Sequence, residues 1–336
     1  MLRYSATNKI KQLILSIIVI CMALNTNAQQ DSQFTQYVFN GLHINPAYAG
    51  YKEDIYVQSF YRSQWEGVKG APKSFSLAAD GAFHDGNVGL GIILSNDQVG
   101  AQSYLTAYAN YAYRIRLNDD GSSRLAFGIA AGLMQLGMDG NKLDNYDTGD
   151  GLIPFGAQTN TVPDARFGVY YASEKFFAGF SATNVLARYM SKKNTENRMV
   201  PVPQPHFYLT AGTMLDLNED IRFKPVILIK DDTKGPSAID LNAFFLFKES
   251  FWIGGFYRTS FDLYKKNYQQ TDLSRQNAIG AIVEVFASQN LRIGYSYDYS
   301  LNKLRSYNYG SHEISAGFYI NRRNSSSDRQ LRCYKF

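Results

Sequence analysis

The sequence has little cysteine, little proline and, past its first 28 residues, no long apolar run. Of its two cysteines only Cys333 lies outside that N-terminal stretch, so no internal disulfide can form once the stretch is removed. Its nine prolines mark no Pro-rich linker, and we predict one large domain. Membrane helices are excluded, because such a helix needs about 20 consecutive apolar residues.

The N-terminal stretch MLRYSATNKIKQLILSIIVICMALNTNA has a basic start, an apolar run over 13–24 and a short polar end. This layout predicts a secretory signal peptide over 1–28, cleaved after Ala28. Ile20 stands where lipidation of Cys21 would need a small residue, so a lipoprotein is not favoured. Without this leader 31 basic side chains face 29 acidic ones, and the pI of 8.9 does not indicate nucleic-acid binding.

Aromatic residues are plentiful instead, with 25 tyrosines and 22 phenylalanines. Outer-membrane barrels use such residues in girdles at the two membrane interfaces. The stretch YLTAYANYAYRIRL at 104–117 alternates between an apolar face and a polar face that ends in two arginines, as a long strand does. Alternation and turn signals together predict about fourteen strands, at 54–65, 73–83, 88–96, 103–117, 124–138, 165–173, 176–186, 205–217, 221–231, 237–247, 251–261, 276–287, 290–300 and 311–320.

The connections between these strands alternate between short and long. The short ones carry Gly, Asn, Asp and Ser turn chemistry, as in HDGN at 84–87 and LNED at 217–220. The pattern predicts an all-β, transmembrane antiparallel β-barrel with short periplasmic turns, long extracellular loops and both termini in the periplasm. The predicted long loops cover about 66–72, 97–102, 139–164, 187–204, 232–236, 262–275 and 301–310.

Charged residues gather on the strand face opposite the apolar one. A charge that faces lipid at mid-bilayer costs about 2–4 kcal/mol, so we expect these side chains in a wet lumen. They would form either a lumen-filling network of ion pairs or a path for a substrate. The predicted network comprises Asp80, Arg114, Arg116, Arg222, Lys224, Lys230, Asp240, Glu284, Arg292, Asp298 and Glu313, and Arg62 and Gln64 share the same face.

The sequence predicts no catalytic, cofactor-binding or metal site. GFSAT around Ser181 lacks the second glycine of a nucleophile elbow, and GLGIIL at 89–94 leads into a strand instead of a helix. The four histidines lack the spacing of metal ligands. Asp144, Asp147 and Asp150 make an acidic loop that misses the register of a calcium loop, so a solvated loop is favoured over a calcium site.

Two segments lack the alternation of a strand. Residues 29–53 are rich in aromatics, and this N-terminal periplasmic or plug segment would have to pack inside the barrel or beneath it. Residues 321–336 are basic and serine-rich, and they predict a periplasmic tail that is either flexible or available to a partner. The barrel would then occupy 54–320.

Three blocks of the sequence resemble a known family. FTQYVFNGLHINPAYAG at 34–50, YRSQWEGVKGAPKSFSLAADG at 61–81 and FKPVILIKDDTKGPSAIDLNAFFLFKESFWIGGFYR at 223–258 are similar to the PorP/SprF outer-membrane proteins of Bacteroidetes, and the chain looks nearest to the SprF branch. The resemblance implies a non-enzymatic accessory protein of type IX secretion and gliding motility. Such a protein would bind the C-terminal domain of a large secreted, SprB-like surface adhesin and support its export or attachment. Other secretion components and outer-membrane lipid or lipopolysaccharide are further expected partners.

The candidate partner-binding residues lie on or beside the predicted long loops. They are Tyr146, Phe155, Tyr189, Tyr264 and Tyr268 on the loops, and Arg62, Gln64 and Trp65 where the first strand meets its loop. Each aromatic could instead belong to a girdle or pack within its own loop, and the group at 62–65 could cap the hairpin EGVKGAP. A passive channel or hydrophobic-solute transporter is the alternative function that a polar lumen allows, and a barrel enzyme such as a phospholipase is a third.

Overall fold

The computed structural model describes residues 34–119, 121–143, 156–187, 189, 203–232, 236–261, 263–264 and 277–320. In this part of the chain the 3-10 helices are η1 Gln36–Phe39, η2 Gly41–His43, η3 Pro46–Tyr48, η4 Gly140–Lys142 and η5 Lys303–Ser306. The strands are β1 Ile55–Ser63, β2 Lys73–Phe83, β3 Val88–Val99, β4 Gln102–Arg116, β5 Arg124–Asp139, β6 Ala157–Ala172, β7 Phe176–Thr183, β8 His206–Thr213, β9 Leu215–Asp216, β10 Ile221–Asp232, β11 Ser237–Phe247, β12 Phe251–Phe261, β13 Ala278–Phe286, β14 Leu291–Ser300 and β15 Ser311–Ile320.

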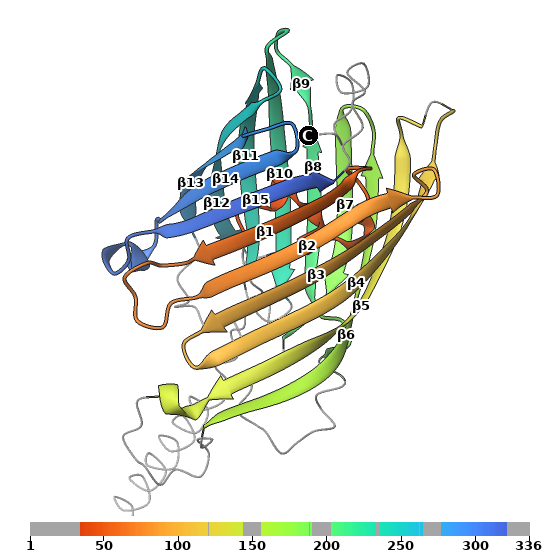
Figure 1. Cartoon of the computed structure of the whole chain (residues 1–336). Coiled ribbons are helices and arrows are strands. Elements are labelled where there is room, and N and C mark those ends of the chain that lie inside the picture. Colours follow the sequence, from red (N-terminus) through yellow and green to blue (C-terminus); the bar gives the residue numbers. More distant parts are fainter. Residues whose placement is uncertain are drawn as a thin grey trace, which may run out of the picture.

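These strands form one closed sheet (Figure 1). Each strand pairs antiparallel with the next along the chain, except that β8 pairs with β10 instead of β9, and β1 also pairs with β15. Because β8 and β9 both pair with β10, β9 continues β8 and the closed barrel has fourteen strands. The predicted all-β antiparallel barrel is therefore confirmed. Closure matters physically, since it leaves no open sheet edge within the ring of paired strands.

The predicted strands agree with the observed ones to within three residues at every boundary but one. The exception is β6, which begins at Ala157, whereas the prediction began it at 165 and left the preceding residues in a loop. That prediction was wrong because the extra residues, AQTNTVPD, carry none of the apolar alternation used to find the other strands. Pro163 also argued against a strand here, because proline has no N–H to donate to a neighbouring strand.

The two ends of the barrel differ in their connections. We call the end with the short connections, such as 84–87 and 173–175, the turn end. The opposite end, where β1 leads to β2 through 64–72 and β14 leads to β15 through 301–310, we call the loop end. Strands β5 and β6 are the longest, with 16 residues each, and they carry the wall farthest out at the loop end (Figure 1).

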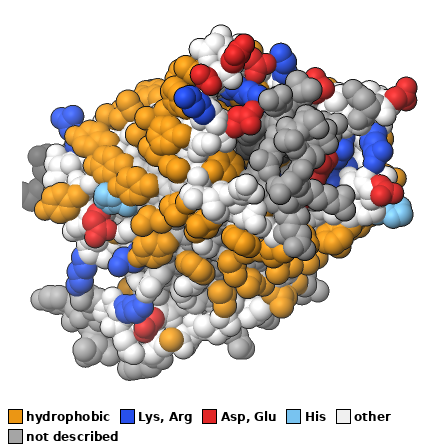
Figure 2. All heavy atoms as spheres, turned by 45° about the horizontal axis from the view of Figure 1, so that its top comes forward, with side chains coloured by type: hydrophobic (Ala, Val, Ile, Leu, Met, Phe, Trp, Pro, Cys, Tyr) orange, Lys and Arg blue, Asp and Glu red, His pale blue; other side chains and the backbone are white. Residues whose placement is uncertain are grey.

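The outer wall of the barrel is apolar, as Figure 2 shows for one side. On β4 and β5, Leu105, Tyr113 and Ile129 are 48%, 50% and 55% exposed, whereas Asn110 and Ala112 between them are buried. The predicted apolar face of 104–117 is thus the outer one. Within the described residues, no helix is long and apolar enough to cross a membrane.

Candidate functional site

The lumen of the barrel is occupied by the chain's own residues 34–54, which we call the lumen segment. Sequence left two placements open, inside the barrel or beneath it, and the structure has this segment inside. Its three 3-10 turns bury Tyr37, Phe39, Leu42 and Tyr48 almost completely. A conformation of this kind, with few internal hydrogen bonds, has to satisfy its main chain through contacts with the barrel.

Two asparagines shape the turns of the lumen segment. The Asn40 side chain accepts the Leu42 N–H at 3.2 Å, and the Asn45 side chain accepts the Ala47 N–H at 2.9 Å. Pro46 follows at the first helical position, where a missing N–H costs nothing. The sequence NPAY therefore specifies a capped turn. The same Asn45 also donates its Nδ2 to the main-chain oxygen of Val169 at 3.0 Å, which fastens the turn to β6.

At the loop end, buried charges hold the start of the lumen segment. The Glu313 carboxylate accepts the N–H groups of Thr35 and Gln36 at 2.8 and 2.9 Å. Arg62 donates to Asp298 at 2.6 Å, to Glu313 at 3.2 Å and to the Thr35 hydroxyl at 2.9 Å. All three charged side chains are 5% exposed or less. Removing one charged partner from such a buried group leaves the charge of the others unpaired, which destabilises the fold.

Arg258 extends this loop-end cluster. It forms a two-point contact with the Asp240 carboxylate, at 2.8 and 2.7 Å, and lies 3.7 Å from Asp298. Arg258 was not among the predicted lumen charges, although it shares the lumen face of its strand with Trp252 and Phe256, which lie six and two residues before it. The period of two along β12 was the signal that could have found it.

Aromatic rings hold the middle of the lumen segment. Phe39 lies edge-on to Phe244 and Trp252, with ring centroids 5.3 and 5.8 Å away. The Tyr37 hydroxyl accepts a hydrogen bond from the Asn242 side chain at 2.8 Å. Phe39, Phe244 and Trp252 belong to the largest buried apolar cluster of the described residues, which lies inside the barrel. The core of this protein therefore depends on the lumen segment.

At the turn end, a second group of charges holds the end of the segment. Asp80 accepts the Gly50 N–H at 2.8 Å, and Arg114 donates to the Gly50 main-chain oxygen. Arg124 pairs with Glu53 at 2.9 Å. The ammonium group of Lys52 lies 3.5 Å from the centroid of the Tyr56 ring. The lumen segment is thus fixed at both ends of the barrel by ionised side chains.

Glycines in the barrel wall make room for the segment. A Cβ at Gly128 would overlap the main chain of Ala47, and one at Gly89 would overlap the main chain of Ala49. Gly168 in β6 and Gly294 in β14 have the same relation to the side chains of Asn45 and Gln36. Glycine is the residue that allows another backbone to approach a strand so closely.

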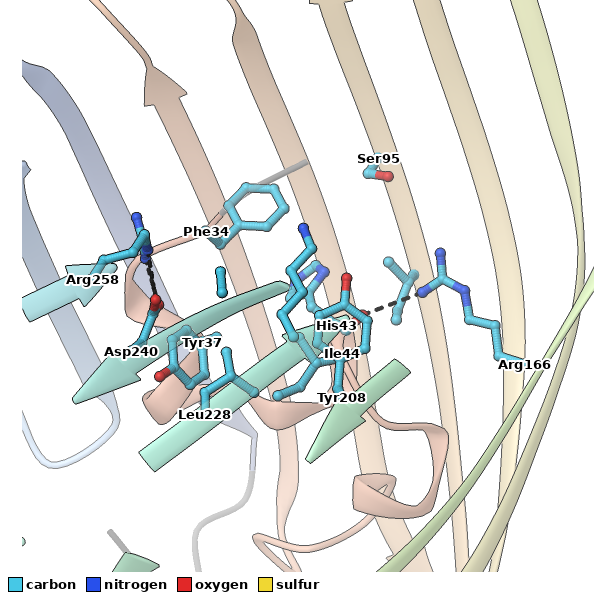
Figure 3. A pocket seen from close by; sticks show the side chains of 13 residues that line it. Phe34, Tyr37, His43, Ile44, Ser95, Arg166, Tyr208, Leu228, Asp240 and Arg258 are labelled. Atoms are coloured by element: carbon cyan, nitrogen blue, oxygen red, sulfur yellow. Dashed lines mark hydrogen bonds and ion pairs between the residues drawn. The ribbon is translucent and has the colours of Figure 1, made fainter. Parts of the chain in front are cut away.

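Little open space remains in the described part of the lumen. One cavity beside the segment has a volume of about 50 Å³. Figure 3 shows its lining, with Tyr37 near the paired Asp240 and Arg258 on one side and Arg166 on the other. Two further cavities around Tyr51 and Ile44 hold about 20 Å³ each. About 10–15 Å³ of such space is enough for one water molecule, so these cavities fit one or a few waters and not a chain of solute molecules.

Most of the predicted lumen charges are buried inside the barrel. Asp80, Arg114, Lys224, Asp240, Glu284, Arg292, Asp298 and Glu313 are buried, Arg292 pairs with Glu284, and Lys230 is half-buried. Two of the predicted lumen charges lie outside the lumen, because they stand where their strands end or begin at the turn end. Arg116 is exposed and donates to the Asp85 main-chain oxygen, and Arg222 pairs with Asp216 and Glu249 at 3.2 Å each.

The candidate partner-binding residues are scattered. Arg62 is 2% exposed inside the barrel, so its side chain is not presented to a partner. Gln64 and Trp65 are half-buried, and the Trp65 N–H donates to the Ser311 hydroxyl at 3.1 Å, a contact across the seam between β1 and β15. Tyr189 and Tyr264 are exposed, at 64% and 47%. Tyr146, Phe155 and Tyr268, like the acidic loop at 144–150, lie outside the described residues.

Among the residues that the structure describes, no three His, Cys, Asp or Glu side chains are grouped closely enough to hold a metal ion. The buried carboxylates are already engaged by arginines and main-chain N–H groups, as the Glu313 contacts show. The arrangement is therefore one that holds a polypeptide segment in place.

Comparison with known proteins relates this barrel to other membrane proteins. The family model described as type IX secretion system membrane protein PorP/SprF matches residues 26–318. Curated proteins give no match. Among solved structures, the CymD monoaromatic hydrocarbon channel has 10% identity over 83% of this chain and 92% of its own, with a TM-score of 0.51. A Pseudomonas aeruginosa FadL homologue has 9% identity over 87% and 95%, with a TM-score of 0.45, and the KdgM porin has 7% over 79% and 99%, with a TM-score of 0.36.

At 10% identity, the likeness to CymD shows a shared barrel fold and nothing about transport. The family match is of a different kind, since it runs through the lumen segment and through every strand up to β15. Together with the apolar outer wall, it assigns the protein to the outer membrane. This chain belongs to the PorP/SprF family of type IX secretion system membrane proteins.

Proposed function

We propose that this barrel is an accessory and anchor of type IX secretion that binds the C-terminal domain of a secreted, SprB-like adhesin and supports its export or surface attachment. The observation that carries the proposal is the filled lumen. A barrel whose interior is closed by its own segment, held at both ends by buried charges, has to act through its surface. The same observation counts against a passive channel or a hydrophobic-solute transporter.

The orientation belongs to the same proposal. The leader over 1–28 directs Sec export, the turn end faces the periplasm, and the loop end faces outward to the adhesin. β15 ends at the turn end, so the chain beyond Ile320 starts on the periplasmic side, where other secretion components could contact it. Lipopolysaccharide would then surround the loop-end rim of the apolar wall.

The test is a pull-down of the full-length barrel in detergent with the purified C-terminal domain of the adhesin. Tyr189 and Tyr264 are the exposed loop-end tyrosines among the candidates, so we expect the double variant Tyr189→Ala, Tyr264→Ala to bind at least about fivefold more weakly, as loss of an aromatic anchor does. Tyr257→Ala is the matched control, because Tyr257 is 42% exposed on the outer wall of β12. Absence of binding by the unaltered barrel would contradict the anchoring role.

A further inference from the structure

The closed barrel has one strand that extends well past its neighbour. All of β6, Ala157–Ala172, pairs with β5. Its ladder with β7 is much shorter and runs only from Phe167, opposite Ala182, to Ala172, opposite Phe177. Among the described residues, the loop-end half of β6 therefore has a strand on one side only, whereas its neighbour β5 is itself paired with β4 as far as Met138 (Figure 1).

The register shows which main-chain groups face the open side. Pro163 has no N–H and lies opposite Leu133 of β5, so position 163 gives β5 no ladder donor. Groups of an antiparallel strand alternate between its two sides, so the residues of the same parity point away from β5. The Ala165 oxygen agrees, since it accepts the Val185 N–H at 3.2 Å from the open side. Ala157, Thr159 and Thr161 therefore direct their N–H and C=O groups outward.

The described residues cover this edge at one point. Beyond the bond to Ala165, the N–H groups of Leu186 and Ala187 both donate to the Asp164 carboxylate at 3.0 Å. Among the described residues, no main-chain bond reaches 157–163 from the open side. Thr159, Thr161 and Pro163 are exposed.

The inner face of the same strand is firmly packed. Val162 lies in an apolar cluster with Met134, Leu136, Met138 and Ala187, all of them 6% exposed or less. Asp164 accepts a hydrogen bond from Tyr108 at 2.7 Å, and the Arg166 guanidinium lies 3.7 Å from the centre of the Tyr108 ring. The edge is therefore presented by a fixed strand, so binding to it would not require that the strand first become ordered.

The chemistry of the edge defines its ligand. Residues 157–163 span about 20 Å, the length of an ordinary strand. Three N–H donors and four C=O acceptors repeat along it with a period of two residues, which matches only an extended polypeptide backbone. Exposed edges are usually blunted by lysine, by inward-turned charge or by proline. Here the outward side chains at 157, 159 and 161 are alanine and threonine, and only Pro163, at one end of the edge, is a residue of the blunting kind.

We propose that the open edge of β6, Ala157–Pro163, binds an extended strand of a partner polypeptide by strand addition. If the proposed function holds, the partner is the C-terminal domain of the adhesin, and this edge is the surface on the barrel that it joins. The affinity then comes from main-chain hydrogen bonds, with little dependence on the threonine side chains.

Amide hydrogen exchange of the free barrel in detergent tests the edge without any partner. We expect the amides of Ala157, Thr159 and Thr161 to exchange at least about 100-fold faster than those of Gln158, Asn160 and Val162, which the β5 ladder protects. Equal protection of the two sets would mean that the chain covers its own edge, and it would overturn the proposal.

The second measurement uses the C-terminal domain of the adhesin as the probe. Thr159→Pro, Thr161→Pro removes two outward N–H groups and should raise the Kd about tenfold or more, since each lost hydrogen bond costs about 1 kcal/mol. Thr159→Val, Thr161→Val keeps the main chain and should change the Kd less than about twofold. Both variants should fold, because proline is tolerated at a strand edge. A heat-modifiability gel checks that they do.

The outcomes separate the two proposals. If the probe binds the unaltered barrel and the proline variant equally well, strand addition is overturned while anchoring stands. If it binds neither, the anchoring role is contradicted. Amide hydrogen exchange of the barrel in isolated outer membranes then tests whether any strand occupies the edge. Slowed exchange of the Thr159 and Thr161 amides there, relative to the purified barrel, supports an occupant, and unchanged fast exchange overturns the inference.

Discussion

At the scale of single residues, the decisive feature is that the lumen charges act on the chain itself. Sequence alone allowed two uses for them, a network that fills the lumen or a path for a substrate. In the structure, Glu313 and Arg62 bind the main chain and hydroxyl of the lumen segment. Their burial makes each dependent on the other, since an ionised group in such a place is stable only when paired.

Loss of Arg62 should be costly for that reason. Arg62→Ala would leave Glu313 buried without its cation and Asp298 with only Arg258, 3.7 Å away, and we expect the free energy of unfolding to fall by about 3–5 kcal/mol. Urea unfolding in detergent, followed by tryptophan fluorescence, measures it. Lys175→Ala is the control, because its pair with Asp216 lies on the surface and contributes about 0–1 kcal/mol. Similar losses in the two variants would contradict the role given to Arg62.

At the scale of elements, the lumen segment and the strand glycines fit one another. Gly128→Ala places a methyl group against Ala47, and overpacking of this kind costs about 1–3 kcal/mol. Gly255→Ala is a matched control, since the atom nearest to its new Cβ is the Gly280 oxygen at 3.3 Å. We expect the first variant alone to lower the unfolding midpoint clearly in the same urea experiment. A larger loss at Gly255 would show that the segment does not pack as described.

The strands and their faces could be predicted because alternation has a fixed period of two. The start of β6 could not, because residues 157–164 lie beyond the apolar wall and have polar outward side chains. The position of the lumen segment was also out of reach. Its contacts join Thr35 to Glu313 and Asn45 to Val169, and these residues lie far apart in the chain. A pattern of neighbouring residues cannot predict contacts of that kind. Arg258 was the exception, since its parity alone would have placed it in the lumen.

At the scale of the whole molecule, the filled lumen predicts that the barrel does not conduct ions. Reconstituted in planar bilayers, the intact protein should show no steady single-channel current, because the described lumen offers cavities of only about 50 and 20 Å³. A variant without residues 34–48 should conduct if it folds, since the segment is what fills the interior. Steady conductance by the intact protein would favour the channel function over anchoring, whatever the variant does.

The contacts of Thr35 with Glu313 also bear on how the barrel is made. The residues that precede the first strand are held in part by Asp298 of β14 and Glu313 of β15, the last two of the described strands. The seam between β1 and β15 joins the first of these strands to the last. An assembly intermediate without β15 therefore lacks both that seam and the Glu313 contacts of Thr35 and Gln36, so closing the cylinder also completes the hold on the start of the segment.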